Sequence, residues 1–184
     1  MKHLTDEQLM KAVANGELNK LSVLFDRYHV RIYNFFQKMT HNKMVSEDLT
    51  QEVFIKVLKY RSSYNDGNFA SWLYTVARNI FSSHYQKQKK ERTNVIEDDI
   101  LSSEGKLFVE SNKEDLEHLQ RSLLKLNDKD RELIVMHKLQ EMQYEQIATI
   151  VGSSENAVKV KTHRALKKLK DIYFRSVNVI GNKN

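Results

Sequence analysis

The chain has 184 residues, carries a formal net charge of +6 and contains no cysteine and no proline. This length allows one ordinary domain or two small ones with a real hydrophobic core, and the lack of cysteine excludes disulfides, catalytic thiolates and cysteine-ligated zinc. The basic balance favours nucleic acid or another polyanion as a partner, and the lack of a long apolar run or signal-peptide core predicts a cytoplasmic protein without membrane insertion.

Hydrophobic residues recur at spacings of three and four along most of the chain, which predicts an all-α fold. Charge divides the chain into three parts, because residues 1–90 carry +6, residues 91–115 carry −5 and residues 116–184 carry +5. We therefore expect two small helical domains, at 1–90 and 116–175, joined by a flexible acidic linker at 91–115 and followed by a tail at 176–184. The alternative for the acidic stretch is one more surface helix.

Residues 18–39 predict one strongly hydrophobic helix. Eight of its residues keep helical spacing and are expected in the core: Leu21, Leu24, Phe25, Tyr28, Ile32, Phe35, Phe36 and Met39. After a polar break, Ser46 can cap a second helix whose first turn holds Glu47 and Asp48, where the helix dipole favours acidic groups.

This second helix has two unlike faces. The residues expected to point inward are Leu49, Val53, Phe54, Val57 and Leu58, and those on the other side are Asp48, Gln51, Glu52 and Ile55. The outward face joins acidic and amide groups to an exposed isoleucine in a basic protein. Such a face is suited to a protein partner and not to DNA.

Residues 61–90 combine a turn with an aromatic and basic helix. Asp66-Gly67 is a strong turn signal, and Asn68 can cap the helix that follows. Its buried line consists of Phe69, Leu73, Val76 and Ile80, and its aromatic and basic character comes from Trp72, Arg78, Asn79, Tyr85, Lys87, Lys89 and Lys90. Rings beside cations are typical of single-strand binders. The alternative, that Trp72 is simply a core residue, is favoured by this domain taken alone.

The clearest local signal is the stretch YEQIATIVGSSENAVKVKTHRALKKLK. A first helix carries Ile147, Ala148 and Val151, Gly152 supplies a residue free to take positive φ, and Ser153 or Ser154 can cap a second helix from about Glu155. The second helix has a buried stripe made of Val158, Thr162, Ala165, Leu169 and Ile172. A short helix, a glycine turn and a second helix with unlike faces indicate a helix-turn-helix.

The other side of that helix predicts a surface for the DNA major groove, formed by Asn156, Lys159, Val160, His163, Arg164 and Lys167. Arg and Lys can pair with guanine and Asn with adenine, and the flanking lysines suit phosphates. The alternative is a merely solvated lysine-rich face, against which the glycine turn and the split faces argue. His163 has no second metal ligand at helical spacing, so we expect no metal site and interpret it as a DNA contact.

Three sequence motifs follow one another along the chain. They are D-x-x-Q-E-x-F from Asp48 to Phe54, W-L-x-x-x-A-R-N from Trp72 to Asn79, and V-K-x-K-x-H-R-A from Val158 to Ala165. Together they resemble a bacterial RNA polymerase sigma factor of the extracytoplasmic-function type. The resemblance covers about residues 10–90 and 115–172 and implies sigma region 2, a helical bundle, at 1–90 and sigma region 4, a helix-turn-helix, at 116–175.

The resemblance implies an alternative sigma factor that directs promoter-specific transcription initiation. The residues expected to dock on the clamp helices of the largest subunit of core RNA polymerase are Asp48, Gln51, Glu52, Phe54 and Ile55. The residues expected at the promoter −10 element and on the strand-separation surface are Tyr64, Asn65, Asp66, Gly67, Asn68, Trp72, Arg78 and Asn79. The six residues of the helix-turn-helix face would recognise the −35 element. An anti-sigma factor is the further partner that the resemblance implies, and the linker would thread the polymerase cleft.

Two departures from the family pattern stand out. Ser83 and Gln86 occupy positions where the family often carries an acidic residue and an arginine, and Val160 stands where a small polar residue is common. No phosphate-binding glycine loop, HExxH helix or Ser/His/Asp arrangement is present, so we expect neither an enzyme nor a cofactor. The alternatives are a free-standing helix-turn-helix transcriptional regulator and a helical adaptor that binds acidic proteins.

Overall fold

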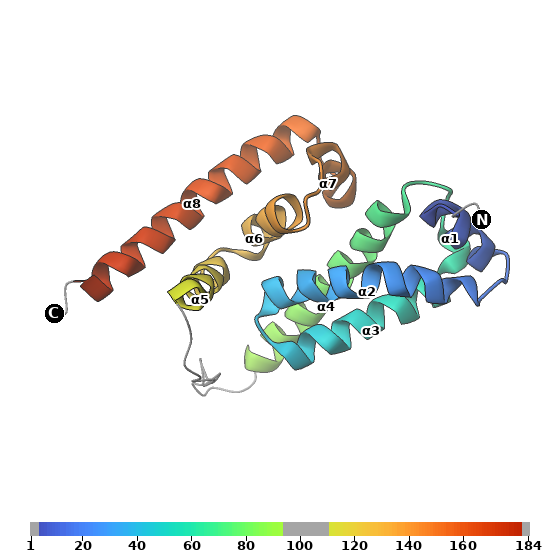
Figure 1. Ribbon diagram of the computed structural model, residues 1–184, viewed down its shortest axis with the longest axis horizontal. Helices are drawn as coiled ribbons and strands as arrows, with labels where there is room; N and C mark the ends of the chain where they lie inside the picture. The colour runs from blue at the N-terminus through green and yellow to red at the C-terminus, as the bar shows by residue number, and fades with distance from the viewer. Residues whose placement is uncertain (1–3, 94–110, 182–184) are drawn as a thin grey trace.

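The computed structural model describes residues 4–93 and 111–181, and side chains over residues 4–88 and 114–175. Every regular element in these ranges is helical, which confirms the all-α prediction (Figure 1). Most of the predicted acidic linker lies outside the described residues. No helix among the described residues is both long enough and apolar enough to cross a membrane.

The N-terminal half consists of α1 (Asp6–Ala14), α2 (Lys20–Thr40), α3 (Lys43–Lys59), the short 3₁₀ helix η1 (Arg61–Ser63) and α4 (Phe69–Thr93). Helix α1, which the sequence analysis did not separate, begins with a capping box between Thr5 and Gln8. Helices α2, α3 and α4 pack side by side, and their apolar faces meet in a common core.

The predicted cap of α3 at Ser46 is wrong, because the cap is Asn42, four residues earlier, and the helix begins at Lys43. The side chain of Asn42 accepts a hydrogen bond from the backbone N–H of Val45 and caps the helix there. Ser46 is buried inside the first turns, and its hydroxyl donates to the Asn42 carbonyl at 2.6 Å. The asparagine thus takes the capping role that we expected of the serine.

The predicted core of the N-terminal half is mostly confirmed. Of the eight residues predicted on α2, six are buried, Leu21 is partly buried and Phe25 is 40% exposed. Phe25 stacks on His29 and contacts the edge of Phe54, so its ring covers the core from outside. Leu58, also expected inside, is 37% exposed.

The C-terminal half consists of α5 (Ser111–Leu124), α6 (Asp128–Ile134), the π-helical segment η2 (Val135–Leu139), α7 (Tyr144–Val151) and α8 (Glu155–Gly181). Gly152 has φ of +64° and ends α7, as the turn of a helix-turn-helix requires. The backbone N–H of Ala157 donates to the Ser154 hydroxyl, which caps α8. The predicted buried stripe of α8 is confirmed at Val158, Thr162, Ala165 and Leu169, with Ile172 partly buried.

The two halves pack against each other and share one cluster of buried residues. This cluster joins residues of α1 to α4 with Leu133, Val135, Met136, Met142, Ile147, Ala148, Ile150 and Val158 of the C-terminal half. Helices α5 and α6 contact α2, and α7 contacts α4. Helix α8 lies outside this layer, against α5, α6 and α7, so its far side is left to solvent (Figure 1).

Replacing Gly152 with alanine should lower the free energy of unfolding by about 1–2 kcal/mol, because a side chain is strained at a left-handed φ. Because an added Cβ would contact nothing within 4 Å, we attribute the expected loss of stability to backbone strain and not to a steric clash. The matched control is Gly67→Ala, where the added Cβ is equally free and φ is not in the left-handed range. Urea unfolding checks both variants, and equal losses would contradict the assignment.

Candidate nucleic-acid and protein interfaces

The predicted DNA face of α8 is exposed along its whole length. All six of its side chains, Asn156, Lys159, Val160, His163, Arg164 and Lys167, are exposed. Val158, Thr162 and Ala165 on the opposite side are fully buried, so packing fixes the rotation of the helix about its axis. The face is therefore presented on a rigid element, with polar and cationic groups directed to solvent.

One of the flanking lysines is not free. The ammonium group of Lys168 lies 2.6 Å from an Asp130 carboxylate oxygen of α6. The lysine is 57% exposed, so this contact is a surface ion pair that water screens. Lys168 therefore connects α8 to α6, in addition to any phosphate contact that its exposure allows.

The acidic side of α3 forms a second exposed surface. Asp48, Gln51 and Glu52 are exposed, and Ile55 is 63% exposed. Glu52 pairs with Lys56 one turn later at 3.1 Å. Phe54 is buried, as its helical spacing predicts, with its ring 4.8 Å from that of Phe25. Phe54, which the resemblance assigns to the same contact, therefore supports the exposed surface from beneath.

The loop before α4 is held in shape by its own side chains. The Tyr64 hydroxyl donates to the Gly67 carbonyl, and burial raises the pKa of Tyr64 to about 12, with nearby carboxylates adding to the shift. Asp66, and not Gly67, takes the left-handed φ, of +53°. Asn68 accepts from the backbone N–H of Ser71 at 2.8 Å, which confirms its predicted capping role.

The loop residues expected at the −10 element divide into two groups. Asn65, Asp66, Gly67 and Asn68 are exposed, whereas Tyr64 is buried against the core. Asp66 also pairs with Lys11 of α1 at 3.0 Å. The structure thus presents a short polar loop whose conformation a buried tyrosine fixes.

Trp72 has features of both predicted roles, a core residue and a ring available to stack on a base. Its ring packs edge-on against Tyr64 at 5.5 Å and against the core residue Phe69 at 6.2 Å, yet it is only partly buried. Beside it is a hollow lined from α4 by Trp72 and Thr75, and from α7 by Gln146 and Thr149. Helix α7 therefore lies next to the predicted strand-separation surface.

Arg78, also predicted to contact DNA, faces a carboxylate of the C-terminal half. Its Nε lies 2.8 Å from the Glu132 carboxylate, whose side chain is only 9% exposed. Burial raises the pKa of Glu132, and the Arg78 charge opposes that rise without cancelling it. Asn79, the next residue, remains exposed. Sequence reasoning missed the pairing because the two residues are far apart along the chain.

Arg131 makes buried polar contacts within the C-terminal half and one to the N-terminal half. Its guanidinium donates to the carbonyls of Leu123 and Leu124 at the end of α5, of Leu126 just after it, and of Met39 at the end of α2, the last at 2.7 Å. Helix ends leave carbonyls without internal partners, and these bonds satisfy several of them. Burial lowers the pKa of Arg131, and Asp128 at 3.3 Å opposes that shift.

Two further hydrogen bonds converge on Gln140, just after η2. The buried Tyr74 hydroxyl donates to its side-chain carbonyl at 2.7 Å, and Arg31 donates to its backbone carbonyl at 3.2 Å. Burial raises the pKa of Tyr74 to about 12. The segment between α6 and α7 is therefore attached to α2 and α4.

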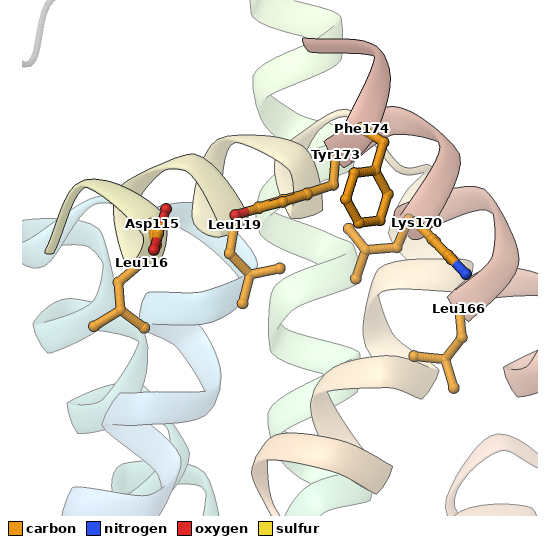
Figure 2. Close-up of a pocket in the computed structure, with 8 residues that line it drawn as sticks. Asp115, Leu116, Leu119, Leu166, Lys170, Tyr173 and Phe174 are labelled. Carbon is orange, nitrogen blue, oxygen red and sulfur yellow. The ribbon is translucent and has the colours of Figure 1, made fainter. Parts of the chain in front are cut away.

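An apolar groove runs between α5 and α8, away from the surfaces described above (Figure 2). Leu116, Leu119, Leu166 and Phe174 line it, with Asp115 and Lys170 among the polar groups at its edge. Leu116 is 63% exposed and Phe174 is 53% exposed. Among the described residues, no group of three or more His, Asp or Glu side chains could hold a metal ion.

Two family models match the chain. The model of Sigma-70 region 2 matches residues 24–91, and the model of Sigma-70 region 4 matches residues 116–169. One curated relative, the ECF RNA polymerase sigma factor SigM of Bacillus subtilis, is 34% identical over 158 residues, which cover 84% of this chain and 96% of the relative.

The fold is similar to those of two solved structures. CnrH, in a structure with the cytosolic domain of CnrY, matches with a TM-score of 0.71 at 20% identity, over 91% of this chain and 96% of that one. The sigma factor RpoE of Bartonella quintana, in a structure with the anti-sigma factor NepR, matches with a TM-score of 0.67 at 21% identity, over 82% and 94%.

The raised pKa of Glu132 predicts how Glu132→Gln changes the dependence of stability on pH. Because the folded chain holds the proton more tightly than the unfolded chain, burial of Glu132 costs least when the carboxyl is protonated. The wild type should gain stability relative to the variant as pH falls from the raised pKa towards 4.5, the ordinary value. Urea unfolding of both proteins across that range checks this, and a difference independent of pH would contradict it.

Proposed function

This chain belongs to the sigma-70 family, as an extracytoplasmic-function sigma factor, and we propose that its two halves divide polymerase binding and promoter recognition between them. As an alternative sigma factor it acts in transcription initiation. In our proposal residues 1–90 bind core RNA polymerase and the −10 element, and residues 116–175 bind the −35 element. Residues 91–115 connect them. The observation that carries this proposal is the presence of two exposed faces of opposite charge, on α3 and on α8.

We assign the α3 face to the clamp helices of the largest polymerase subunit. Gln51 and Glu52 lie one turn before the exposed Ile55, and Asp48 lies one turn before them, so an apolar contact would lie beside acidic and amide groups. Complementary charge steers encounter and fixes orientation more than it adds affinity, and the isoleucine supplies apolar area. A DNA duplex is the wrong partner for this face because both surfaces are negative.

The −35 element is assigned to the exposed face of α8. Arg164, Lys159 and Lys167 can pair with guanine edges, and Asn156 can pair with adenine. His163 lies among them and is exposed as well. Because the opposite side of α8 is packed in the core, the helix cannot rotate about its axis, and these side chains would face the major groove together.

The −10 element is assigned to the loop from Tyr64 to Asn68 and to the adjoining side of α4. Extruding a base costs a few kcal/mol, which stacking and edge hydrogen bonds offset. The exposed polar loop offers such bonds, and the partly buried Trp72 offers a ring beside it. Since α7 lies beside Trp72 and Glu132 pairs with Arg78, we propose that the C-terminal half moves away from α4 before the unpaired strand binds.

We expect that this chain performs no catalysis and acts by binding alone.

We also expect an anti-sigma factor as a further partner of this chain. Of the two similar structures, one holds CnrH with the cytosolic domain of CnrY, and the other holds the sigma factor RpoE with the anti-sigma factor NepR. The apolar groove between α5 and α8 is suited to an amphipathic helix of a protein partner (Figure 2).

Glu52→Lys tests the polymerase face. Reversing this charge should weaken binding to core RNA polymerase at least tenfold, about 1.4 kcal/mol, because it places a cation on the face that would meet a basic surface. Titration of the fluorescently labelled chain with core polymerase measures this. The matched control is Glu117→Lys on α5, since Glu117 has a similar exposure and an equivalent ion pair one turn later. Equal weakening by both variants would count against the assignment.

Arg164→Ala tests the −35 face. In complex with core polymerase, the variant should lose about 1–3 kcal/mol of discrimination between its promoter and a promoter with an altered −35 element. Arg175→Ala is the control, because it removes the same exposed side chain about 16 Å further along the same helix. Transcription from the two templates reports the ratio, and an unchanged ratio in Arg164→Ala would refute the assignment.

A further inference from the structure

Val160 is an apolar side chain in the middle of a polar and cationic face. It is 48% exposed, and the residues around it on α8, Asn156, His163 and Arg164, are exposed as well. Among the described residues of α8, the large hydrophobic side chains that are exposed are Val160 and Phe174. Phe174 lines the apolar groove of Figure 2, so it belongs to another surface.

The fold of the chain does not require a valine at this position. Val158 and Thr162, on either side of it in sequence, are fully buried and supply the packing of this turn. A β-branched residue on an exposed helix surface is less favourable than alanine by up to about 0.7 kcal/mol. Single exposed apolar residues are common on proteins, so position and not exposure alone gives Val160 its meaning.

The position of Val160 is central to the DNA face. Residues four before, three after and four after it are neighbours on a helix surface, and here these are Asn156, His163 and Arg164. Any duplex that meets those three side chains therefore meets Val160 too. A valine side chain has no hydrogen-bonding group, so it can contribute only an apolar contact.

The one methyl group that the major groove displays is the C5-methyl of thymine, and it offers more apolar surface than the C5–H of cytosine. Most other features of the base edges there are hydrogen-bond donors or acceptors, which a valine would bury without a partner at a cost. Resting on the proposed −35 function, we propose that Val160 packs against the C5-methyl of a thymine in the −35 element and so selects an A·T pair at that position. Val160 is thus a residue that determines specificity.

The test uses the full chain with core polymerase, first to find its promoter and then to remove one methyl group. A randomised duplex library selected with the wild-type complex identifies the −35 sequence. Each thymine of that sequence is then replaced in turn by deoxyuridine, which differs only in lacking the C5-methyl. We expect one replacement to weaken binding of the wild-type complex about fourfold, the fold-change for burying one methyl-sized group.

The Val160→Ala variant completes a double-mutant cycle with the same duplexes. Alanine favours the helix and leaves the buried side of α8 untouched, so the variant should fold. Its complex should bind the thymine and deoxyuridine duplexes equally. The inference is overturned if no replacement affects the wild type, or if Val160→Ala keeps the same fourfold dependence. A library in which the wild-type complex enriches no sequence would contradict the proposed −35 function itself.

Discussion

The arrangement of this chain depends on a small set of buried polar contacts between its two halves. The Arg131 guanidinium donates hydrogen bonds to backbone carbonyls at the ends of α5 and α2, so one side chain of α6 holds this helix against both. Cationic groups are costly to bury unless they are fully hydrogen-bonded, and here four carbonyls satisfy the charge. Glu132, the next residue, faces Arg78 of α4. These adjacent residues therefore attach the C-terminal half to two helices of the N-terminal half.

This packing gives the predicted functional surfaces different accessibility. The α3 face proposed for polymerase and the α8 face proposed for the −35 element are open to solvent, since neither helix uses that side for packing. The side of α4 around Trp72 and Arg78 instead lies beside α7 and Glu132. The surfaces proposed for duplex DNA and polymerase are ready to bind, and the one proposed for an unpaired strand is partly covered. Binding that favours separated halves would shift the chain towards an open form.

The sequence predicted the local features well because they depend on nearby residues. The positive φ of Gly152, the cap at Asn68 and the buried stripe of α8 each follow from a few neighbouring positions, and the structure has them all. The all-helical fold follows from apolar spacing in the same way. The roles at polymerase and promoter came from the resemblance, and individual residue roles stay predictions.

The features that sequence reasoning missed depend on distant parts of the chain. Arg131 appears as one more charge in a helix, and only the folded chain brings the Met39 carbonyl to it. The spacing of Phe54 predicted its burial, but only the folded chain shows that its ring packs on Phe25 of α2. The capping of α3 by Asn42 rather than Ser46 shows a smaller error, since either side chain can cap and the local competition decided.

The most direct test of this account is to hold the two halves together and ask whether a promoter still opens. The chain has no cysteine, so Thr75→Cys with Thr149→Cys gives one defined site for a short, reducible bismaleimide across the hollow between α4 and α7. Permanganate reactivity of thymines around the −10 element measures opening by the chain with core polymerase. We predict that the cross-linked chain gives no reactive thymines and that reduction of the linker restores them. Full reactivity from the cross-linked chain would contradict the account.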